Sequence, residues 1–551
     1  MKLNGAQIVV KQLIAHGIST VFGYPGGQVL PLYDELYKNA DKVRHILSAH
    51  EQGAAHAADG WARASGKTGV VIATSGPGAT NLVTGIATAY LDSVPLVAIT
   101  GNVPVAMLGK DSFQEVDIVG ITQPVVKHSF AVWDVESLEH TLNEAFRVAN
   151  SGRKGPVLID IPRNIQTDTC EYLGKPFSQT TKTPHNFDAK QLADAINGAK
   201  KPFIYAGGGV IASGAQAQLR ELSEKLSAPV GFSMMGLTAL PHDYALNLGM
   251  CGMHGKYAAT VAKSECDVMI ALGVRFSDRA TGNVDAYTKE KVIIHVDIDL
   301  AEMDKNVSTT MTACGDIKEI LTELLPKLSV LHNDEWVSRI EELKQIQKEP
   351  EDDKFTPKNI IESVESILGE DILVATDVGQ HQMWVMQYYK FCKPQTLLTS
   401  GGLGTMGYGL GAAIGGCMAL NKKRTVLFTG DGSFGMNLNE LATAVSNEVP
   451  VVIVLLNNGV LGMVRQWQNM FFDHRYSQTT LNRKTDYAAL AKAFGAEGYT
   501  ADNLLQFKEI LKNLPANSPA LIDCRICMDE KVFPMIPPGG TVKDIIIRGK
   551  E

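Results

Sequence analysis

Short runs of apolar residues alternate along the chain with longer stretches in which apolar and polar residues recur at helical spacing. Each run is four to six residues long and ends at turn-forming residues. This alternation predicts parallel sheets wrapped by helices. In the first part of the chain, from Gly5 to Arg163, the expected strands are Thr20–Gly23, Gly69–Thr74, Leu96–Thr100 and Val157–Ile161.

The same alternation recurs twice more. The expected strands are Phe203–Ala206, Val268–Leu272 and Val292–Asp297 in a second unit, and Ile372–Ala375, Val426–Thr429 and Val451–Leu456 in a third. A polar segment rich in Thr and Lys separates the first two units, and a charged helical stretch from Asn333 to Asp353 precedes the third. We therefore predict an α/β protein with three doubly wound parallel-sheet domains at residues 1–165, 188–332 and 357–551, joined by linkers at 166–187 and 333–356.

Composition narrows the possible partners. Of 551 residues, 45% are hydrophobic and 20% are charged, which is ordinary for a compact globular chain. The 51 basic and 59 acidic residues leave a formal net charge of -8, which offers no broad attraction to nucleic acid or anionic lipid. No apolar run approaches the roughly 20 residues of a membrane helix. We expect small-molecule partners, no nucleic acid, no membrane, and a cytoplasmic location.

Two polar motifs follow neighbouring strands of the third unit. Gly430-Asp431-Gly432-Ser433 comes directly after one strand, and Asn457-Asn458 comes directly after the next. Parallel strands end at the same edge of a sheet, where phosphorylated ligands bind. The Asp431 carboxylate, the Asn458 amide oxygen and a carbonyl near Val460 are hard oxygen ligands, and two phosphate oxygens would complete an octahedral Mg²⁺ shell. Either motif alone is more typical of a turn; the pair favours a site.

The GDG motif, a spacer of this length and the NN motif resemble those of the thiamine diphosphate-dependent enzymes. That family also uses a glutamate from another domain, which the segment His50–Gly60 supplies at Glu51. The resemblance implies that Glu51 hydrogen-bonds the aminopyrimidine ring and promotes removal of the thiazolium proton. His50 and His56 are weaker candidates for the base, because the cofactor itself takes that role. The structural alternative for Glu51 is an exposed helix acid.

Three further segments, Gly109–Glu115, Ser400–Gly407 and Gly462–Gln468, resemble those of acetohydroxyacid synthase catalytic subunits. The resemblance implies that Met406 holds the bent cofactor and that Gln380, His381, Gly432 and Ser433 lie near its diphosphate. It also places Phe113, Gln114 and Lys127 over the active site, with Gln114 and Lys127 as catalytic candidates beside Glu51, and Trp467 at the pocket for the second substrate. A flexible core methionine and a packing tryptophan are the structural alternatives. Gly411 replaces an expected proline, which puts a local helix start in doubt.

The middle unit resembles the FAD-binding domain of the biosynthetic synthases in its segments His254–Arg275 and Asp297–Asp316. This resemblance implies FAD contacts at His254, Arg275, Asp297 and Asp316, and a further one at Arg163. A strand followed by Gly207, Gly208 and Gly209 is suited to a pyrophosphate, although the run lacks the full dinucleotide spacing.

The resemblance implies decarboxylation of pyruvate on thiamine diphosphate and transfer of the two-carbon unit to pyruvate or 2-ketobutyrate, in the synthesis of valine, leucine and isoleucine. FAD would be structural. The implied assembly is a homodimer or homotetramer with Glu51 from one chain and Asp431 from another, with a small regulatory subunit as a possible further partner. The alternatives are another thiamine diphosphate carboligase, a pyruvate oxidase, or a non-catalytic flavin- or nucleotide-binding protein.

Overall fold

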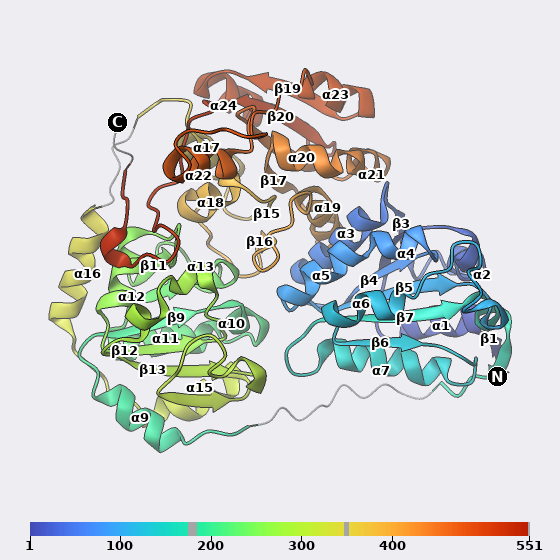
Figure 1. The fold of residues 1–551 in the computed structure, drawn as a ribbon, viewed down its shortest axis with the longest axis horizontal. Helices are drawn as coiled ribbons and strands as arrows, with labels where there is room; N and C mark the ends of the chain where they lie inside the picture. The colour runs from blue at the N-terminus through green and yellow to red at the C-terminus, as the bar shows by residue number, and fades with distance from the viewer. Residues whose placement is uncertain (175–184, 347–351, 549–551) are drawn as a thin grey trace.

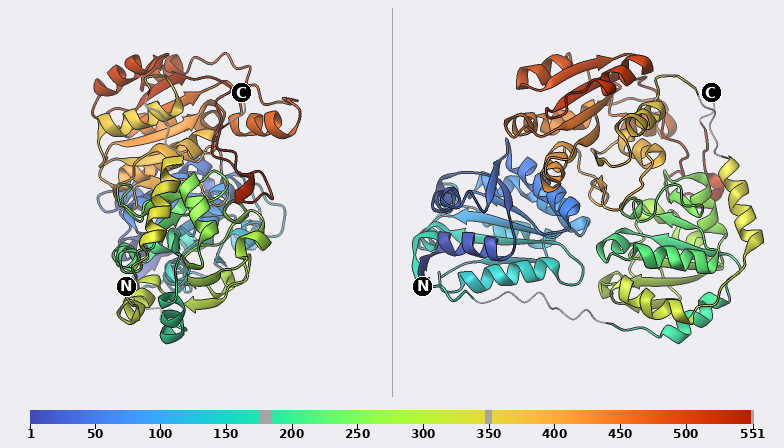
Figure 2. Two further views of the ribbon diagram at one scale, coloured as in Figure 1. Left: turned by 90° about the vertical axis from the view of Figure 1, so that its left-hand side faces the viewer. Right: turned by 180° about the vertical axis from the view of Figure 1, so that it is seen from behind.

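Three α/β domains follow one another along the chain, each built on its own parallel sheet of six strands (Figure 1). The computed structural model describes residues 1–174, 185–346 and 352–548. The N-terminal domain is blue to cyan, the middle domain is green, and the C-terminal domain is orange to red; the view from behind in Figure 2 shows the same arrangement. Each domain lies beside the other two, and the predicted fold class is confirmed.

The N-terminal sheet is fully parallel and covered by helices. In order across the sheet its strands are β3 (Arg44–Leu47), β2 (Thr20–Tyr24), β4 (Gly69–Ala73), β5 (Leu96–Asn102), β7 (Pro156–Pro162) and β6 (His128–Ala131). The helices are α1 (Gly5–Ala15), α2 (Leu30–Lys38), α3 (Glu51–Ser65), α4 (Pro77–Asn81), α5 (Val83–Leu91), α6 (Ile118–Thr122), α7 (Leu138–Asn150) and α8 (Arg163–Thr167).

The C-terminal sheet repeats this strand order. Across the sheet its strands are β16 (Leu397–Leu398), β15 (Leu373–Thr376), β17 (Thr425–Gly430), β18 (Val451–Asn457), β20 (Ala520–Arg525) and β19 (Glu497–Ala501). The helices are α17 (Pro357–Leu368), α18 (Gln380–Tyr388), α19 (Gly409–Ala419), α20 (Asp431–Asn437), α21 (Leu441–Ser446), α22 (Gly462–Phe471), α23 (Tyr487–Phe494) and α24 (Leu504–Lys512). The order reverses between β15 and β17, so a crevice for ligands is expected at their carboxyl ends.

The middle sheet has the strand order 3-2-1-4-5-6 of dinucleotide-binding domains, counted within the domain. Across the sheet its strands are β11 (Asn247–Met250), β10 (Val230–Phe232), β9 (Pro202–Ala206), β12 (Val268–Leu272), β13 (Val292–Asp297) and β14 (Met311–Cys314). The helices are α9 (Ala189–Asn197), α10 (Gly208–Ala212), α11 (Gln216–Leu226), α12 (Tyr257–Glu265), α13 (Asp278–Thr281), α14 (Val284–Thr288), α15 (Ile317–Leu324) and α16 (Asp334–Ile346). Here the order reverses between β9 and β12.

All the strands predicted from apolar runs are present, and their ends differ from the prediction by no more than two residues. They lie inside the sheets and are buried on both faces, which explains their continuous apolar character. The strands that the pattern missed are mostly edge strands of mixed polarity, such as β3, β6 and β19. Among the described residues, no helix combines the length and the apolar character needed to cross a bilayer.

Parts of both predicted linkers are ordered against a domain. In the first, β8 (Thr169–Glu171) pairs antiparallel with β1 (Lys2–Asn4) on the N-terminal domain, while residues 175–184 lie outside the described residues. In the second, α16 buries Trp336, Ile340 and Leu343 against the middle domain. These three apolar residues at helical spacing within a charged stretch explain why α16 extends that domain.

Helices α3 and α19 form the main contact between the N-terminal and C-terminal domains. Glycines allow this approach. A Cβ atom on Gly411 would lie 2.7 Å from the Gly53 carbonyl oxygen and 2.9 Å from the His56 Cβ. Helix α19 begins at Gly409 without a proline, so the doubt about this helix start is removed. A side chain at position 411 is excluded by the backbone of α3.

We expect Gly411→Ala to lower the free energy of unfolding by roughly 1–3 kcal/mol, because the added methyl group overpacks the contact between α3 and α19. The higher helix propensity of alanine offsets part of this loss. Thermal or urea unfolding of the full chain measures the change. Gly27→Ala is the matched control, since a Cβ there meets no heavy atom within 4 Å. Equal melting temperatures for the two variants would contradict the prediction.

Candidate active site

The two polar motifs of the C-terminal domain lie side by side, as the sequence predicts. Strand β17 ends at Gly430, whose register partner on β18 is Leu456. Asp431 begins α20 directly afterwards and is buried, and its Oδ1 has no hydrogen-bond partner among the described residues. Burial raises the pKa of the Asp431 carboxyl to about 6. A buried carboxylate oxygen without a partner is costly, so this atom is suited to a ligand that the fold itself does not provide.

Asn458 and Val460 lie next to Gln380. The Asn458 side-chain amide donates to Gln380 Oε1 at 3.3 Å, and the Val460 backbone amide donates to Asn458 Oδ1 at 3.3 Å. A Cβ atom on Gly462 would overlap the Gln380 side-chain amide, so this glycine permits the close approach of α22. The predicted residues Gln380, Asn458 and Val460 therefore come together beyond the carboxyl ends of β15 and β18, which flank β17.

His381, Ser433 and Met406 complete the cluster around the GDG motif. A Cβ atom on Gly430 would lie 3.1 Å from His381 Nδ1, and one on Gly432 would lie 3.7 Å from Met406 Cε. Burial lowers the pKa of His381 to about 3, so its ring is neutral at pH 7. The Ser433 hydroxyl donates to the Val378 carbonyl oxygen at 2.7 Å and anchors α20.

The donor set around Asp431 fits Mg²⁺ coordinated jointly by protein and diphosphate oxygens. It offers one carboxylate, one amide oxygen and one backbone carbonyl, all hard oxygen ligands. Within the described part of the chain, no three or more His, Cys, Asp or Glu side chains form a metal cluster. A cation held here would therefore take further ligands from a bound molecule.

Asp377, which the sequence analysis missed, fixes the segment that carries Met406. Its carboxylate accepts hydrogen bonds from the Gly407 backbone amide at 2.7 Å and the Thr429 hydroxyl at 3.2 Å. Asn437 donates to the Gly407 carbonyl oxygen at 3.0 Å from the other side. Burial raises the pKa of Asp377 to about 6. The signal in the sequence is an aspartate directly after a buried strand.

Glu51 is the first residue of α3 and is half-buried. Its Oε2 accepts a hydrogen bond from the Asn81 amide at 2.9 Å. The start of α3 is held by Glu440 of the C-terminal domain, which accepts from the backbone amides of Ala49 and His50 at 3.2 and 3.0 Å. Among the described residues of this chain, no hydrogen bond or ion pair joins Glu51 to Asp431.

The two histidines of the same segment have structural partners. His50 Nδ1 accepts from the Gln52 backbone amide at 3.1 Å and caps α3. His56 is fully buried with its ring edge against Tyr408, and burial lowers its pKa to about 3.

Gln114 packs against Gly76 at the start of α4, whereas Lys127 lies against the end of α7. A Cβ atom on Gly76, next to α4, would lie 2.7 Å from the Gln114 carbonyl oxygen, and Phe113 beside it is 85% exposed. Lys127 instead donates to the Val148 and Ser151 carbonyl oxygens at the end of α7. Burial lowers the pKa of Lys127 to about 8. The structure thus gives Lys127 a role in holding the end of a helix.

Trp467 lies on α22 where the middle and C-terminal domains meet. Its indole Nε1 is buried without a hydrogen-bond partner among the described residues. The Arg279 guanidinium lies over the ring at 5.6 Å, and Phe471 contacts it edge-on at 5.8 Å. Arg279 belongs to α13 of the middle domain, so only the tertiary structure brings it to Trp467.

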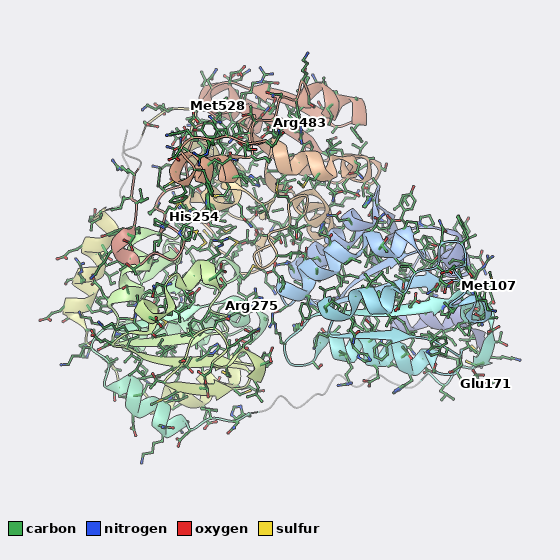
Figure 3. All side chains as sticks on the ribbon, viewed as in Figure 1. Met107, Glu171, His254, Arg275, Arg483 and Met528 are labelled. Carbon is green, nitrogen blue, oxygen red and sulfur yellow. The ribbon has the colours of Figure 1, made fainter. Side chains whose placement is uncertain are left out.

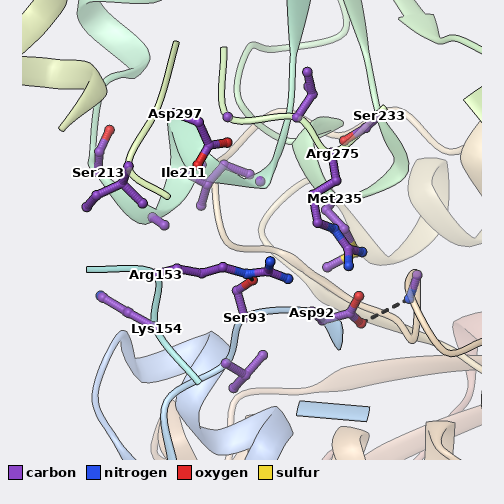
Figure 4. A pocket seen from close by; sticks show the side chains of 18 of the residues that line it. Asp92, Ser93, Arg153, Lys154, Ile211, Ser213, Ser233, Met235, Arg275 and Asp297 are labelled. Atoms are coloured by element: carbon purple, nitrogen blue, oxygen red, sulfur yellow. Dashed lines mark hydrogen bonds between the residues drawn. The ribbon is translucent and has the colours of Figure 1, made fainter. Parts of the chain in front are cut away.

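A cavity of about 480 Å³ opens where the three domains meet, at the switch point of the middle sheet (Figure 4). Five of the residues predicted to bind FAD line it: Gly208, Gly209, Arg275, Asp297 and Asp316. A Cβ atom on Gly209 would lie 2.7 Å from Gly273 Cα, so the loops after β9 and β12 touch. Burial raises the pKa of Asp297, at the end of β13, to about 6.

Three predicted FAD contacts lie outside the lining of this cavity. Gly207 instead donates its backbone amide to the Leu272 carbonyl oxygen at 2.9 Å. The His254 carbonyl oxygen accepts from the side-chain amide of Gln387 in the C-terminal domain at 2.9 Å, and Figure 3 shows His254 above Arg275. Arg163 is exposed at the start of α8.

Arg153, rather than Arg163, brings a guanidinium from the N-terminal domain to this cavity (Figure 4). It donates to the Ser93 hydroxyl at 2.8 Å and to Glu302 Oε1 of the middle domain at 2.7 Å. The sequence signal is weak, since Arg153 lies in an ordinary glycine-flanked turn. Three arginines (Arg63, Arg153 and Arg275), two strand-end aspartates and glycines in close contact line the cavity and fit an elongated dinucleotide.

Comparison with known proteins agrees with these three domains. Models described as the N-terminal TPP binding domain, the central domain and the C-terminal TPP binding domain of thiamine pyrophosphate enzymes match residues 3–121, 189–324 and 377–524. Thiamine pyrophosphate is another name for thiamine diphosphate.

Similar proteins extend this match to the whole chain. The chain is 44% identical to acetolactate synthase isozyme 2 large subunit of Escherichia coli (strain K12), over 99% of each chain. It is 43% identical to a probable acetolactate synthase large subunit of Methanocaldococcus jannaschii, over 99% of this chain and 95% of the relative. Together with the strand-end cluster around Asp431, this likeness shows that the chain belongs to the acetolactate synthase large subunits within the thiamine pyrophosphate enzyme family.

Proposed function

We propose that this chain forms 2-acetolactate from two molecules of pyruvate, and 2-aceto-2-hydroxybutyrate from pyruvate and 2-ketobutyrate. One pyruvate loses CO₂, and its two remaining carbons add to the keto carbon of the second acid, with no net transfer of electrons to a redox partner. The observation that carries the proposal is the buried Asp431, whose Oδ1 has no partner in the described part of the chain, at the switch point of the C-terminal sheet with Asn458 and Met406. Such a place suits a diphosphate and a cation.

The cofactors of the proposed reaction are thiamine diphosphate, Mg²⁺ and FAD. Thiamine diphosphate, when bound, supplies the carbon nucleophile and accepts the electron pair that decarboxylation releases. Asp431, Asn458 and the Val460 carbonyl would hold Mg²⁺ against the diphosphate. His381 Nε2, at the start of α18, is buried without a hydrogen-bond partner among the described residues and is suited to a diphosphate oxygen. The neighbouring Gln380 amide donates to Gln466 and to the Glu530 carbonyl oxygen, so Gln380 would act by holding Asn458 in place.

Glu51 is the proposed proton-handling residue. Its carboxylate can exchange a proton with a ring nitrogen placed at the start of α3. Glu440 holds this helix start through two backbone hydrogen bonds, and Asn81 orients the Glu51 carboxylate. Met406 offers an apolar side chain on a segment that Asp377 fixes, and Gln114, beside Gly76 at the start of α4, is a further proposed contact of the substrate.

A homodimer is the proposed minimal active unit, with a homotetramer as a possible larger assembly. Glu51 of one chain would face Asp431 of the other, which agrees with the finding that no hydrogen bond or ion pair joins the two within the described part of one chain. Large apolar side chains near the proposed site are exposed, namely Phe113, Leu403 and Met436. A second chain would bury them. Because relatives are named large subunits, a smaller regulatory subunit is a further proposed partner.

Trp467 and Arg279 form the proposed pocket for the second ketoacid. The indole face suits the alkyl group of the acceptor, and the adjacent guanidinium suits its carboxylate. A pyruvate oxidase or another carboligase would share the Asp431 cluster, so this pocket is what favours acetolactate formation.

Purified full-length protein given pyruvate, thiamine diphosphate, Mg²⁺ and FAD should produce acetolactate. The measurement is product analysis that separates acetolactate from acetaldehyde and hydrogen peroxide. Peroxide as the main product would favour the oxidase, and no turnover in the complete mixture would overturn the proposed function.

Glu51→Gln should lower turnover by at least ~100-fold while cofactor binding persists, since an amide cannot exchange its proton in the required way. Steady-state kinetics and a thiamine diphosphate titration measure the two effects separately. The exposed Glu221 on α11 supplies the matched control, Glu221→Gln, for which wild-type turnover is expected. Near-normal turnover of Glu51→Gln would remove Glu51 from the mechanism.

Trp467→Leu should reduce any preference for 2-ketobutyrate over pyruvate as the acceptor, because contact with one methylene group is worth roughly 1–3 kcal/mol, or ~10–200-fold. Acetolactate formation from pyruvate alone should persist. A competition assay with both ketoacids measures the product ratio, and Trp133→Leu, at a tryptophan that is 59% exposed, is the control. Loss of stability and activity with an unchanged product ratio would show that Trp467 is a packing residue.

A further inference from the structure

A buried charge network joins the cavity between the three domains to the segment that carries Met406. Asp92, at the end of α5, has a fully buried side chain and lines the cavity. Its carboxylate accepts hydrogen bonds from the backbone amide of Gly401 at 3.0 Å (Figure 4) and from that of Gly402 at 2.7 Å. The same carboxylate accepts from Arg63 Nη2 at 3.0 Å.

Arg63 extends this network to the far end of the segment. It donates to both oxygens of the buried Asp59, at 2.6 and 3.3 Å, and its guanidinium lies over the ring of Tyr408. The Tyr408 hydroxyl also donates to Asp59, at 2.6 Å. A buried carboxylate or guanidinium is stable only when it is paired and hydrogen-bonded, so the three charges define one arrangement of their partners.

The segment between Gly401 and Tyr408 is held at both ends, by Asp92 at Gly401 and Gly402 and by Asp377 and Asn437 at Gly407. It contains no helix or strand, and residues Gly401–Gly404 are exposed. Its further contacts with the N-terminal domain include the hydrogen bond between the Thr405 and Thr88 hydroxyls, at 2.8 Å. The position of Met406 beside Gly432 therefore depends on both ends of the segment, and the Gly401 end forms part of the cavity wall.

We propose that Asp92 is a positioning residue that couples occupancy of this cavity to binding at the Asp431 cluster, through residues 401–408. A dinucleotide in the cavity would order its wall, Arg275 and Gly401 included, and so favour the backbone arrangement that Asp92 holds. Part of the ordering needed at Met406 would then precede the binding of thiamine diphosphate. The inference rests on the proposed binding of FAD. It assigns a physical role, the ordering of residues 401–408, to a flavin that takes part in no redox step.

Coupling of this kind is reciprocal, so it can be measured by binding alone. The full-length protein is stripped of cofactors and titrated with FAD, with and without saturating thiamine diphosphate and Mg²⁺. The reverse titration follows thiamine diphosphate with and without FAD. For the wild-type chain we expect each ligand to raise the affinity of the other by the same factor, at least about fivefold.

In the Asp92→Asn variant, the factor by which one cofactor raises the affinity for the other should fall close to one. The amide presents only one acceptor oxygen to the two glycine amides and leaves Arg63 with less compensating charge. Gly402→Ala tests the same segment without a change of charge, since a Cβ there would lie 2.8 Å from Asp92 Oδ1 and 2.9 Å from Arg275 Nη2. Asp371→Asn is the matched control, because Asp371 also pairs with two cations, Lys393 and Lys423, but is 62% exposed.

The outcomes separate this inference from the proposed function. A wild-type protein that binds both cofactors without mutual enhancement overturns the coupling and leaves the proposed function intact. If Asp92→Asn and Gly402→Ala both show the same mutual enhancement of cofactor affinity as the wild-type protein, the proposed role of Asp92 is overturned. A flat FAD titration in wild-type protein overturns the proposed flavin and this inference together. The proposal is supported if the mutual enhancement of cofactor affinity is lost in both variants and unchanged in the Asp371→Asn control.

Discussion

A parallel sheet brings the carboxyl ends of all its strands to one edge, and the functional arrangement of this protein depends on that constraint. Where the strand order reverses, the loops diverge and leave space that side chains of the sheet do not fill. The C-terminal sheet reverses between β15 and β17, where Asp377 and Asp431 follow the two strands. The middle sheet reverses between β9 and β12, where the glycine loops and Arg275 line the cavity.

Buried carboxylates at these sheet edges fix the surrounding backbone or are suited to bind a ligand. Asp377 accepts hydrogen bonds from its own domain, so its role is to hold backbone. Asp431 instead keeps one oxygen that no described residue contacts by a hydrogen bond, and this oxygen is suited to a ligand. Asp92 holds backbone across a domain boundary and is compensated by Arg63. Because a buried charge is costly without partners, each group limits how its neighbours can move. Positional accuracy at Met406 and Glu51 follows from such contacts.

Contacts between the domains position the residues of the proposed sites as much as contacts within each domain do. Glu440 of the C-terminal domain holds the start of α3, while α3 packs on α19 through glycines. Arg279 of the middle domain reaches Trp467 of the C-terminal domain, and Arg153 of the N-terminal domain reaches Glu302 of the middle domain. Substrate and cofactor groups placed at these junctions would be held by all three domains.

The sequence by itself determined the domain architecture and the cluster at Asp431. Interior strands are continuous apolar runs, and motifs at the ends of adjacent parallel strands must meet, so the approach of Asp431 to Asn458 follows from local pattern alone. Edge strands such as β19 have mixed polarity and were missed. Only the tertiary structure decided that Arg153 and not Arg163 lines the cavity, that Lys127 holds the end of α7, and that Asp92 contacts Gly401. These contacts join residues from different domains or distant loops, and no periodicity along the chain records which loops face each other across a domain boundary.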